Sequence, residues 1–193
     1  MRGEVIALNG TSSAGKSTLA AEMQTQLVAR NRCWVILGID DFLGKLPAPW
    51  VRYLEAGSHA EEGVSFERVG GDIVFRAGAI GRAVLTGYRR SIAAVVRSGV
   101  NVIVDEVVLD EQAWAQWRAE LRPLDPFWVR VDCPIEVCER RERARPDRLP
   151  GLARSQATFV HRYPPYDYAV NTSTALPAEL AQAVIAAYAA RRR

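Results

Sequence analysis

The residues with the clearest chemical meaning form a phosphate-loop pattern, GxxxxGK[ST], which reads GTSSAGKS from Gly10 to Ser17. Glycines let backbone N–H groups turn inward around a polyphosphate, and the N-terminus of a following helix adds partial positive charge. Lys16 is then a point charge for the outer phosphates of ATP, and the Ser17 hydroxyl is a ligand for Mg²⁺. The predicted nucleotide-binding residues are Gly10, Thr11, Ser12, Ser13, Ala14, Gly15, Lys16, Ser17 and Thr18.

Acidic residues follow two further apolar runs. Asp40 comes shortly after the run at 34–37, and Asp105 and Glu106 come directly after the run at 100–104. Because residues after parallel strands gather at one edge of a sheet, we expect these acids beside the phosphate loop. Asp105 is the predicted carboxylate for Mg²⁺, bound directly or through water; its alternative role is an ordinary cap or loop acid. Glu106 is a weaker candidate, either as an acid that supports the metal carboxylate from behind or for orienting a water.

Asp40 is the candidate general base. In phosphoryl transfer from ATP the acceptor hydroxyl must lose its proton, and a carboxylate within hydrogen-bond reach receives it. The neighbouring Asp41 is able to exchange roles with Asp40. The structural alternative for the pair is capping of a short helix around Phe42.

An arginine-rich run follows the apolar segment at 127–131 and predicts a cationic lid over residues 139–151. Helical spacing places Arg141, Arg145 and Arg148 roughly on one side. Such cations neutralise the charge that builds on a transferred phosphoryl group, as arginine fingers do. The alternative is a solvated helix with Glu–Arg pairs.

The elements that must position these residues alternate along the chain. Continuous apolar runs are typical of strands buried on both faces of a parallel sheet. We expect such strands at 5–8, 34–37, 100–104 and 127–131, with a fifth near 168–171. Helices are expected at 16 to about 30, about 77–98, 111–121 with Asp110 as N-cap, and 177–190. This alternation predicts an α/β fold with a five-stranded parallel sheet flanked by helices.

Residues 42–76 interrupt the alternation and are expected to form an insertion on the acceptor side. The segments 64–69 and 72–75 alternate in twos around Gly70-Gly71, which predicts a β-hairpin. The insertion's aromatic side chains are candidates for lining an apolar acceptor pocket, or for packing alone: Phe42, Trp50, Tyr53, Phe66 and Phe75. His59 and His161 have no partner at ligand or triad spacing, so we expect structural or surface roles.

Length and composition limit the kinds of protein to which this chain can belong. A length of 193 residues, 49% hydrophobic and 24% charged, fits one globular domain over residues 1–193. A net charge of +3 with clustered arginines argues against a nucleic-acid partner. No apolar run is long enough to span a bilayer, and Cys33, Cys133 and Cys138 lack metal-ligand spacing. We therefore expect a cytoplasmic protein without membrane contact, and the oligomeric state stays open.

Several segments together resemble the chloramphenicol phosphotransferase family. They are Asn9–Ser17, Gly38–Asp40, Val104–Glu106, Asp147–Gly151 and the tail from Val160 to Thr172. The resemblance runs nearly end to end. It implies a P-loop kinase fold, ATP and Mg²⁺ as cosubstrates, and phosphorylation of a small-molecule hydroxyl in antibiotic inactivation or tailoring. It also implies that Asp40 is the catalytic aspartate and that Arg141, Arg145 and Arg148 are lid arginines.

The acceptor region departs from the family pattern. Asp41 stands where the resembling enzymes carry a small polar residue, and 47–76 matches only at the glycine-rich hairpin. The same catalytic residues therefore also fit a different acceptor, which could be another antibiotic, a biosynthetic intermediate or a nucleoside-like molecule. An acidic acceptor needs nearby cations, for which Arg52, Arg68, Arg76 and Arg82 are candidates.

Two further hypotheses share the phosphate loop. One is a nucleotide-dependent regulatory switch that orders a loop, although no guanine-reading NKxD element is evident. The other is a toxin kinase that acts on a nucleotide sugar.

Overall fold

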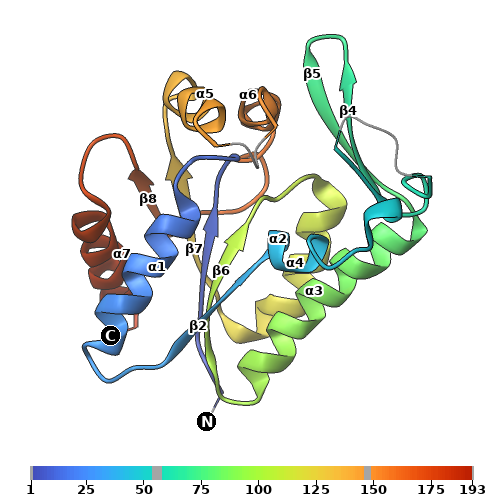
Figure 1. The fold of residues 1–193 in the computed structure, drawn as a ribbon. Helices are drawn as coiled ribbons and strands as arrows, with labels where there is room; N and C mark the ends of the chain where they lie inside the picture. Colours follow the sequence, from blue (N-terminus) through green and yellow to red (C-terminus); the bar gives the residue numbers. More distant parts are fainter. Residues whose placement is uncertain (1, 54–57, 146–148, 193) are drawn as a thin grey trace.

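The computed structural model describes residues 2–53, 58–145 and 149–192 (Figure 1). A five-stranded sheet forms its centre, with the strand order β2-β6-β1-β7-β8. Every neighbouring pair of strands is parallel, so the predicted five-stranded parallel sheet is confirmed. The strands are β1 (Val5–Asn9), β2 (Trp34–Gly38), β6 (Asn101–Glu106), β7 (Phe127–Asp132) and β8 (Tyr168–Asn171).

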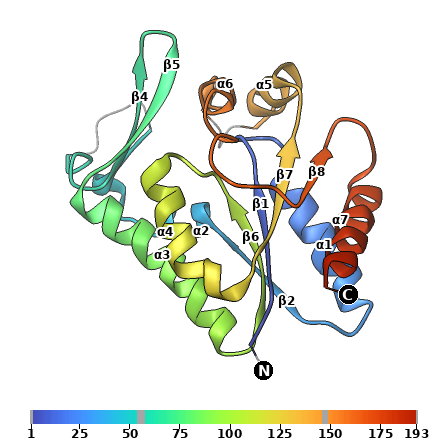
Figure 2. The same cartoon turned by 180° about the vertical axis from the view of Figure 1, so that it is seen from behind.

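Helices cover both faces of this sheet, as Figures 1 and 2 show. On one face, Ile6 and Leu8 of β1 belong to a core shared with α1 (Lys16–Val28) and α7 (Pro177–Arg191). On the other, Val5 and Ala7 belong to a core shared with α3 (Ala79–Arg97) and α4 (Glu111–Leu121). Because successive side chains of a strand point to opposite faces, burial on both explains the continuous apolar runs.

The helices lie close to their predicted positions. Helix α1 ends at Val28, α3 starts at Ala79, and α7 extends to Arg191. Asp110 caps α4 as predicted, because its Oδ1 accepts a hydrogen bond from the Ala113 N–H at 2.7 Å. Among the described ranges, each helix is too short or too polar to cross a bilayer.

Between β2 and α3 the chain forms a second, three-stranded sheet with the order β3-β4-β5. Its strands are β3 (Val51–Tyr53), β4 (Val64–Val69) and β5 (Asp72–Ala77), and β4 and β5 pair antiparallel. The predicted hairpin is therefore confirmed, with β5 two residues longer than expected. Gly70 has a φ of 63°, the left-handed conformation that favours glycine in a tight turn.

Short helices that the sequence analysis did not delimit complete the edge around the phosphate loop. Helix α2 (Ile39–Leu43) follows β2 directly, and the 3-10 helices η1 (Ala48–Trp50) and η2 (Arg122–Leu124) lie in connections. Helices α5 (Ile135–Arg143) and α6 (Leu152–Ala157) stand together above the carboxyl ends of the strands (Figure 1). Helices α2, α5 and α6 thus lie at the carboxyl ends of the strands, on the same side of the sheet as the loop after β1.

Candidate active site

The phosphate loop connects the end of β1 to the start of α1. Gly10 lies against β7, and a Cβ at this position would be 2.4 Å from the Val131 carbonyl oxygen. Gly15 has a φ of 92° at the N-cap of α1. Only glycine meets both requirements without strain. The Lys16 ammonium lies inside the loop and donates to the Thr11 carbonyl at 2.8 Å.

Three elements distant in sequence hold this loop. Gln156 of α6 accepts the Ser12 N–H through its Oε1 at 2.6 Å. The Thr172 hydroxyl donates to the Ala14 carbonyl at 2.6 Å. Arg141 of α5 donates to the Ser13 carbonyl at 3.3 Å and to Thr172 Oγ1 and O at 3.1 Å each. These bonds fix the Ser12 N–H and the carbonyls of Ser13 and Ala14 from neighbouring elements.

Asp105 lies at the end of β6 beside the start of α1. The Ser17 hydroxyl donates to Asp105 Oδ2 at 2.6 Å, and the Lys16 Nζ is 3.7 Å from Asp105 Oδ1. The parallel register places Asp105 opposite Leu8 of β1 and Gly38 of β2. A hydroxyl and a carboxylate next to a phosphate loop are hard oxygen donors of the kind that Mg²⁺ prefers, with phosphates and water completing its shell. The residues therefore fit a magnesium ion.

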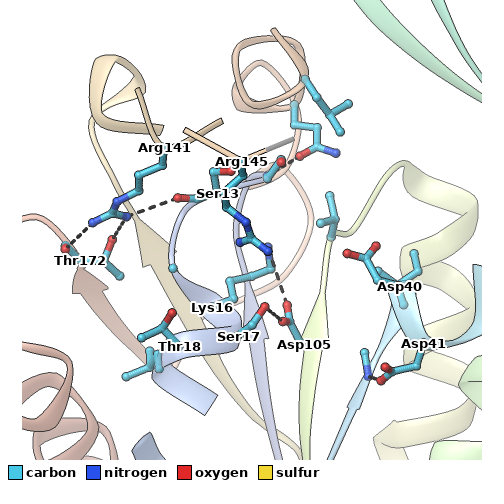
Figure 3. A pocket seen from close by; sticks show the side chains of 18 of the residues that line it. Ser13, Lys16, Ser17, Thr18, Asp40, Asp41, Asp105, Arg141, Arg145 and Thr172 are labelled. Carbon is cyan, nitrogen blue, oxygen red and sulfur yellow. Dashed lines mark hydrogen bonds and ion pairs between the residues drawn. The ribbon is translucent and has the colours of Figure 1, made fainter. Parts of the chain in front are cut away.

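The structure separates the two neighbouring aspartates that the sequence left interchangeable. Asp41 Oδ2 accepts the Gly38 N–H at 2.7 Å, so this carboxylate caps α2. Asp40 occupies the first turn of α2 and faces across the cavity toward Lys16 and Asp105 (Figure 3). The capping alternative therefore holds for Asp41, and both aspartates line the cavity described below.

A single cavity of about 510 Å³ joins these groups. Lys16, Ser17, Asp105 and Asp40 all line it. Its lining also includes apolar side chains from α2, the hairpin, the segment after β6 and α6: Leu43, Phe66, Phe75, Val107, Leu109 and Leu152. The volume is in the range of small-molecule sites, and its polar groups converge near the phosphate loop.

Only part of the insertion's aromatic set lines this cavity. Phe66 and Phe75 do so, which agrees with the predicted acceptor role. Phe42 packs on Tyr88 with ring centroids 5.0 Å apart, and Trp50 stacks on His59 at 4.6 Å. Tyr53 does not line the cavity; its ring stacks on that of Phe66, with the ring centroids 5.3 Å apart.

The lid arginines differ in their surroundings. Arg141 and Arg145 both line the cavity, and Arg148 lies outside the described residues. Helix α5 ends at Arg143, so Arg145 comes from the chain after it and reaches down toward Lys16 and Asp105 (Figure 3). Arg141, in contrast, binds the phosphate loop and Thr172.

Two glutamates of the arginine-rich segment 139–151 contact helix α6. Glu142 is buried and accepts the N–H groups of Gly151 at 3.0 Å and Ala153 at 2.8 Å, which caps α6. Glu139 pairs with Arg154 of α6 at 2.6 Å. The two glutamates therefore tie α5 to α6.

Glu106 does not line the cavity. Its side chain is fully buried, and burial raises its pKa to about 7, although Arg89, Tyr88 and the Val107 N–H oppose the rise. Its Oε1 accepts the Val107 N–H at 2.9 Å. Glu106 thus lies outside the cavity lining, behind Asp105, where a supporting role fits better than contact with a water in the cavity.

Several residues that shape the site were not among the predicted site residues. Gln156, Thr172 and Glu142 act through contacts distant in sequence. Asn9 is buried at the end of β1, where its amide donates to the Val160 carbonyl at 2.7 Å and its Oδ1 accepts the Val108 N–H at 2.8 Å. Two signals mark Asn9: it is a polar residue that ends an apolar strand, and it opens the segment Asn9–Ser17 that resembles the family.

Comparisons with known proteins agree with this geometry. The sequence profile described as chloramphenicol phosphotransferase-like protein matches residues 3–189. A Mycobacterium tuberculosis protein (strain H37Rv) named as an O-phosphotransferase is 31% identical over 196 aligned positions, covering 97% of this chain and 83% of that protein.

Solved structures share the fold. The Mycobacterium tuberculosis APS kinase in complex with AMPPNP and APS is 22% identical, with a TM-score of 0.64 and coverage of 97% of this chain and 98% of that one. The Acinetobacter baumannii shikimate kinase in complex with shikimate is 17% identical, with a TM-score of 0.60 and coverage of 98% and 94%. The chain therefore has the P-loop kinase fold and belongs to the chloramphenicol phosphotransferase-like family.

Proposed function

We propose that this protein is an ATP-dependent O-phosphotransferase that moves the γ-phosphoryl group of ATP onto a hydroxyl of a small molecule. The observation that carries the proposal is the shared cavity, in which Asp40 faces Lys16 and the Ser17–Asp105 pair. Transfer between two bound substrates requires a phosphate cradle and a proton acceptor on opposite sides of one site.

The phosphate loop binds the nucleotide. Residues Gly10 to Thr18 supply backbone N–H groups and the N-terminus of α1, and Lys16 supplies the charge for the outer phosphates. Ser17 and Asp105 would hold Mg²⁺, which would supply charge neutralisation for the phosphate oxygens.

Asp40 receives the proton of the acceptor. The hydroxyl oxygen forms a bond to the γ-phosphorus while its proton passes to the Asp40 carboxylate. The bond between the γ-phosphorus and the bridging oxygen breaks, and ADP leaves with that electron pair. Lys16 and the lid arginines Arg145 and Arg148 neutralise the charge on the transferred group, whereas Arg141 orients the loop.

Residues 42–76 form the acceptor side and residues 139–151 the arginine-rich lid in this proposal. The apolar lining by Phe66, Phe75 and Leu109 suits an alcohol with an apolar body, such as an antibiotic or a related metabolite. The free thiols of Cys33, Cys133 and Cys138 and the use of ATP suit a cytoplasmic enzyme.

The test is a panel of small alcohols incubated with the protein and Mg-ATP, read by ³¹P NMR for a new phosphomonoester and by ADP release. We expect ADP and phosphomonoester in equal amounts for at least one alcohol class, and loss of both in Lys16→Met. Lys45→Met, which changes an exposed lysine outside the cavity lining, is the matched control and keeps the activity. Hydrolysis of ATP without any phosphomonoester across the panel would overturn the proposal.

A further inference from the structure

A second cavity of about 190 Å³ adjoins the first, because Phe75 and Leu109 line both. Its remaining lining comes from β5, from α3 and from the first turns of α4. Two arginines of α3, Arg82 and Arg89, face it. They are seven residues apart, which places them on the same side of the helix. The small cavity therefore extends the acceptor end of the large one with cationic groups.

Arg89 is a buried cation. Only 3% of the surface of Arg89 is exposed. Its Nη1 donates to Gln116 Oε1 at 2.7 Å, and its guanidinium lies 5.7 Å from the Trp117 ring centroid. Its Nε has no hydrogen-bond partner among the described residues. Its charge acts on the buried Glu106 carboxyl, whose pKa it lowers against the effect of burial. Because the Nε is buried without an acceptor, the guanidinium is suited to a further anion in the small cavity.

The remaining charges of the small cavity leave it net positive. The Arg82 side chain is anchored by a bond from Nη1 to the Ala77 carbonyl at 2.6 Å at the exposed rim. Asp110 also lines the cavity, but its Oδ1 is the cap acceptor for α4 at 2.7 Å. Gln112 and Gln116 add amide groups to the lining. Among the lining residues, two guanidinium groups therefore accompany one carboxylate that is already hydrogen-bonded, and the buried Glu106 interacts with Arg89 from outside the lining.

We propose that the small cavity binds a carboxylate of the acceptor through Arg89 and Arg82, which makes the acceptor a hydroxy acid. Guanidinium groups bind carboxylates through paired, charge-assisted hydrogen bonds. The shared walls Phe75 and Leu109 give the acceptor an apolar middle between its carboxylate and the hydroxyl that faces Asp40. The identity of this ligand as the acceptor rests on the proposed function, whereas the anion site itself does not.

The first experiment measures the site without catalysis. Benzoate and its neutral isostere benzamide are titrated into the protein, and binding is followed by NMR. We expect benzoate to bind at least about tenfold more tightly than benzamide, and Arg89→Met to remove this difference. Lys16→Ala controls for binding at the phosphate loop and is expected to leave the benzoate affinity unchanged within about twofold.

Variants on α3 keep the test informative if Arg89→Met fails to fold. Arg82→Gln changes only the rim and is expected to weaken benzoate binding at least about threefold. Arg90→Gln is the matched control, since Arg90 is exposed on the same helix, pairs with Glu120 and does not line the cavity. Equal affinities for benzoate and benzamide, or benzoate binding that survives Arg82→Gln and any folded Arg89→Met, would overturn the anion site.

The second experiment measures turnover with hydroxy acids and their methyl esters at fixed Mg-ATP. We expect a kcat/KM for the acids at least about tenfold above that for the esters, with the preference lost in Arg82→Gln. Faster transfer to the esters would remove the hydroxy-acid assignment and leave the phosphotransferase proposal standing. Transfer to neither class, with benzoate still bound, would instead count against the proposed function.

Discussion

Arg141 shows how one side chain serves the phosphate loop without being one of its residues. Its guanidinium joins the Ser13 carbonyl to Thr172, and the Thr172 hydroxyl in turn bonds to the Ala14 carbonyl. The arginine therefore fixes the two loop residues before Gly15 from outside. Sequence spacing predicts Arg141 as a lid cation, and it lines the cavity; from its contacts we infer that it also positions the loop.

Arg141→Met tests this role. The variant loses its bonds to Ser13 and Thr172, so we expect a Kd for ATP at least about tenfold higher, measured by calorimetry. The single-turnover rate at saturating ATP should fall by less than the affinity, because the arginine acts on the loop rather than on the reacting atoms. Arg140→Met, which changes an exposed neighbour on α5, is the control. An unchanged Kd in Arg141→Met would contradict the positioning role.

At the scale of elements, α5 and α6 form one unit because Glu142 caps α6. The buried carboxylate accepts two backbone N–H groups, and Gln156 of the capped helix binds Ser12 of the phosphate loop. The position of the loop therefore depends on a contact within the lid.

Glu142→Ala leaves the N–H groups of Gly151 and Ala153 without their acceptor. We expect the free energy of unfolding to fall by about 1–3 kcal/mol in urea titrations. Amide exchange at both residues should become faster. Glu139→Gln, which removes a surface ion pair to Arg154, is expected to change stability little. Equal effects of the two variants would show that the cap does not stabilise α6.

The elements differ in how well the sequence predicts them. The central strands were predictable because burial on both faces makes their sequences apolar throughout, and Gly70-Gly71 marked the hairpin. Helix α2 has five residues, too few to show a helical period, so the sequence suggests it only as a short helix around Phe42, without bounds. Gln156 and Thr172 reach the phosphate loop across 144 and 158 residues, and no local pattern reports such contacts. Arg89 resembles any helical arginine until its burial is seen.

For the whole molecule, stability at acidic pH depends on His161. Burial, and secondarily the charge of Arg130, lowers the pKa of this imidazole to about 4. Its Nδ1 is 2.8 Å from the Tyr166 hydroxyl, which also receives a hydrogen bond from Asn9. The histidine is thus neutral in the segment that packs beside the phosphate loop.

The sign of the pH effect follows from this shift. Below pH about 6.5 the unfolded chain protonates His161 while the folded protein does not, so this residue contributes a loss of stability as pH falls toward about 4. Glu106, whose pKa burial raises to about 7, contributes in the opposite direction over the same range, so the effect of His161 is read from the difference between variant and wild type. We expect His161→Gln to lose less stability than the wild type between these values, measured by urea unfolding at each pH. His59→Gln, at an exposed histidine, is expected to follow the wild type. Parallel curves for His161→Gln and the wild type would refute the assignment.

The central claim is that Asp40 takes the proton of the acceptor in the cavity that holds the ATP phosphates. The most direct measurement compares single-turnover phosphoryl transfer, followed by rapid quench, in Asp40→Asn and in Asp41→Asn. We predict that Asp40→Asn slows transfer by about 10²–10⁴-fold with ATP affinity within about twofold of the wild type. Asp41→Asn keeps an oxygen to cap α2 and should transfer at close to the wild-type rate. Transfer at the wild-type rate in Asp40→Asn would contradict the account.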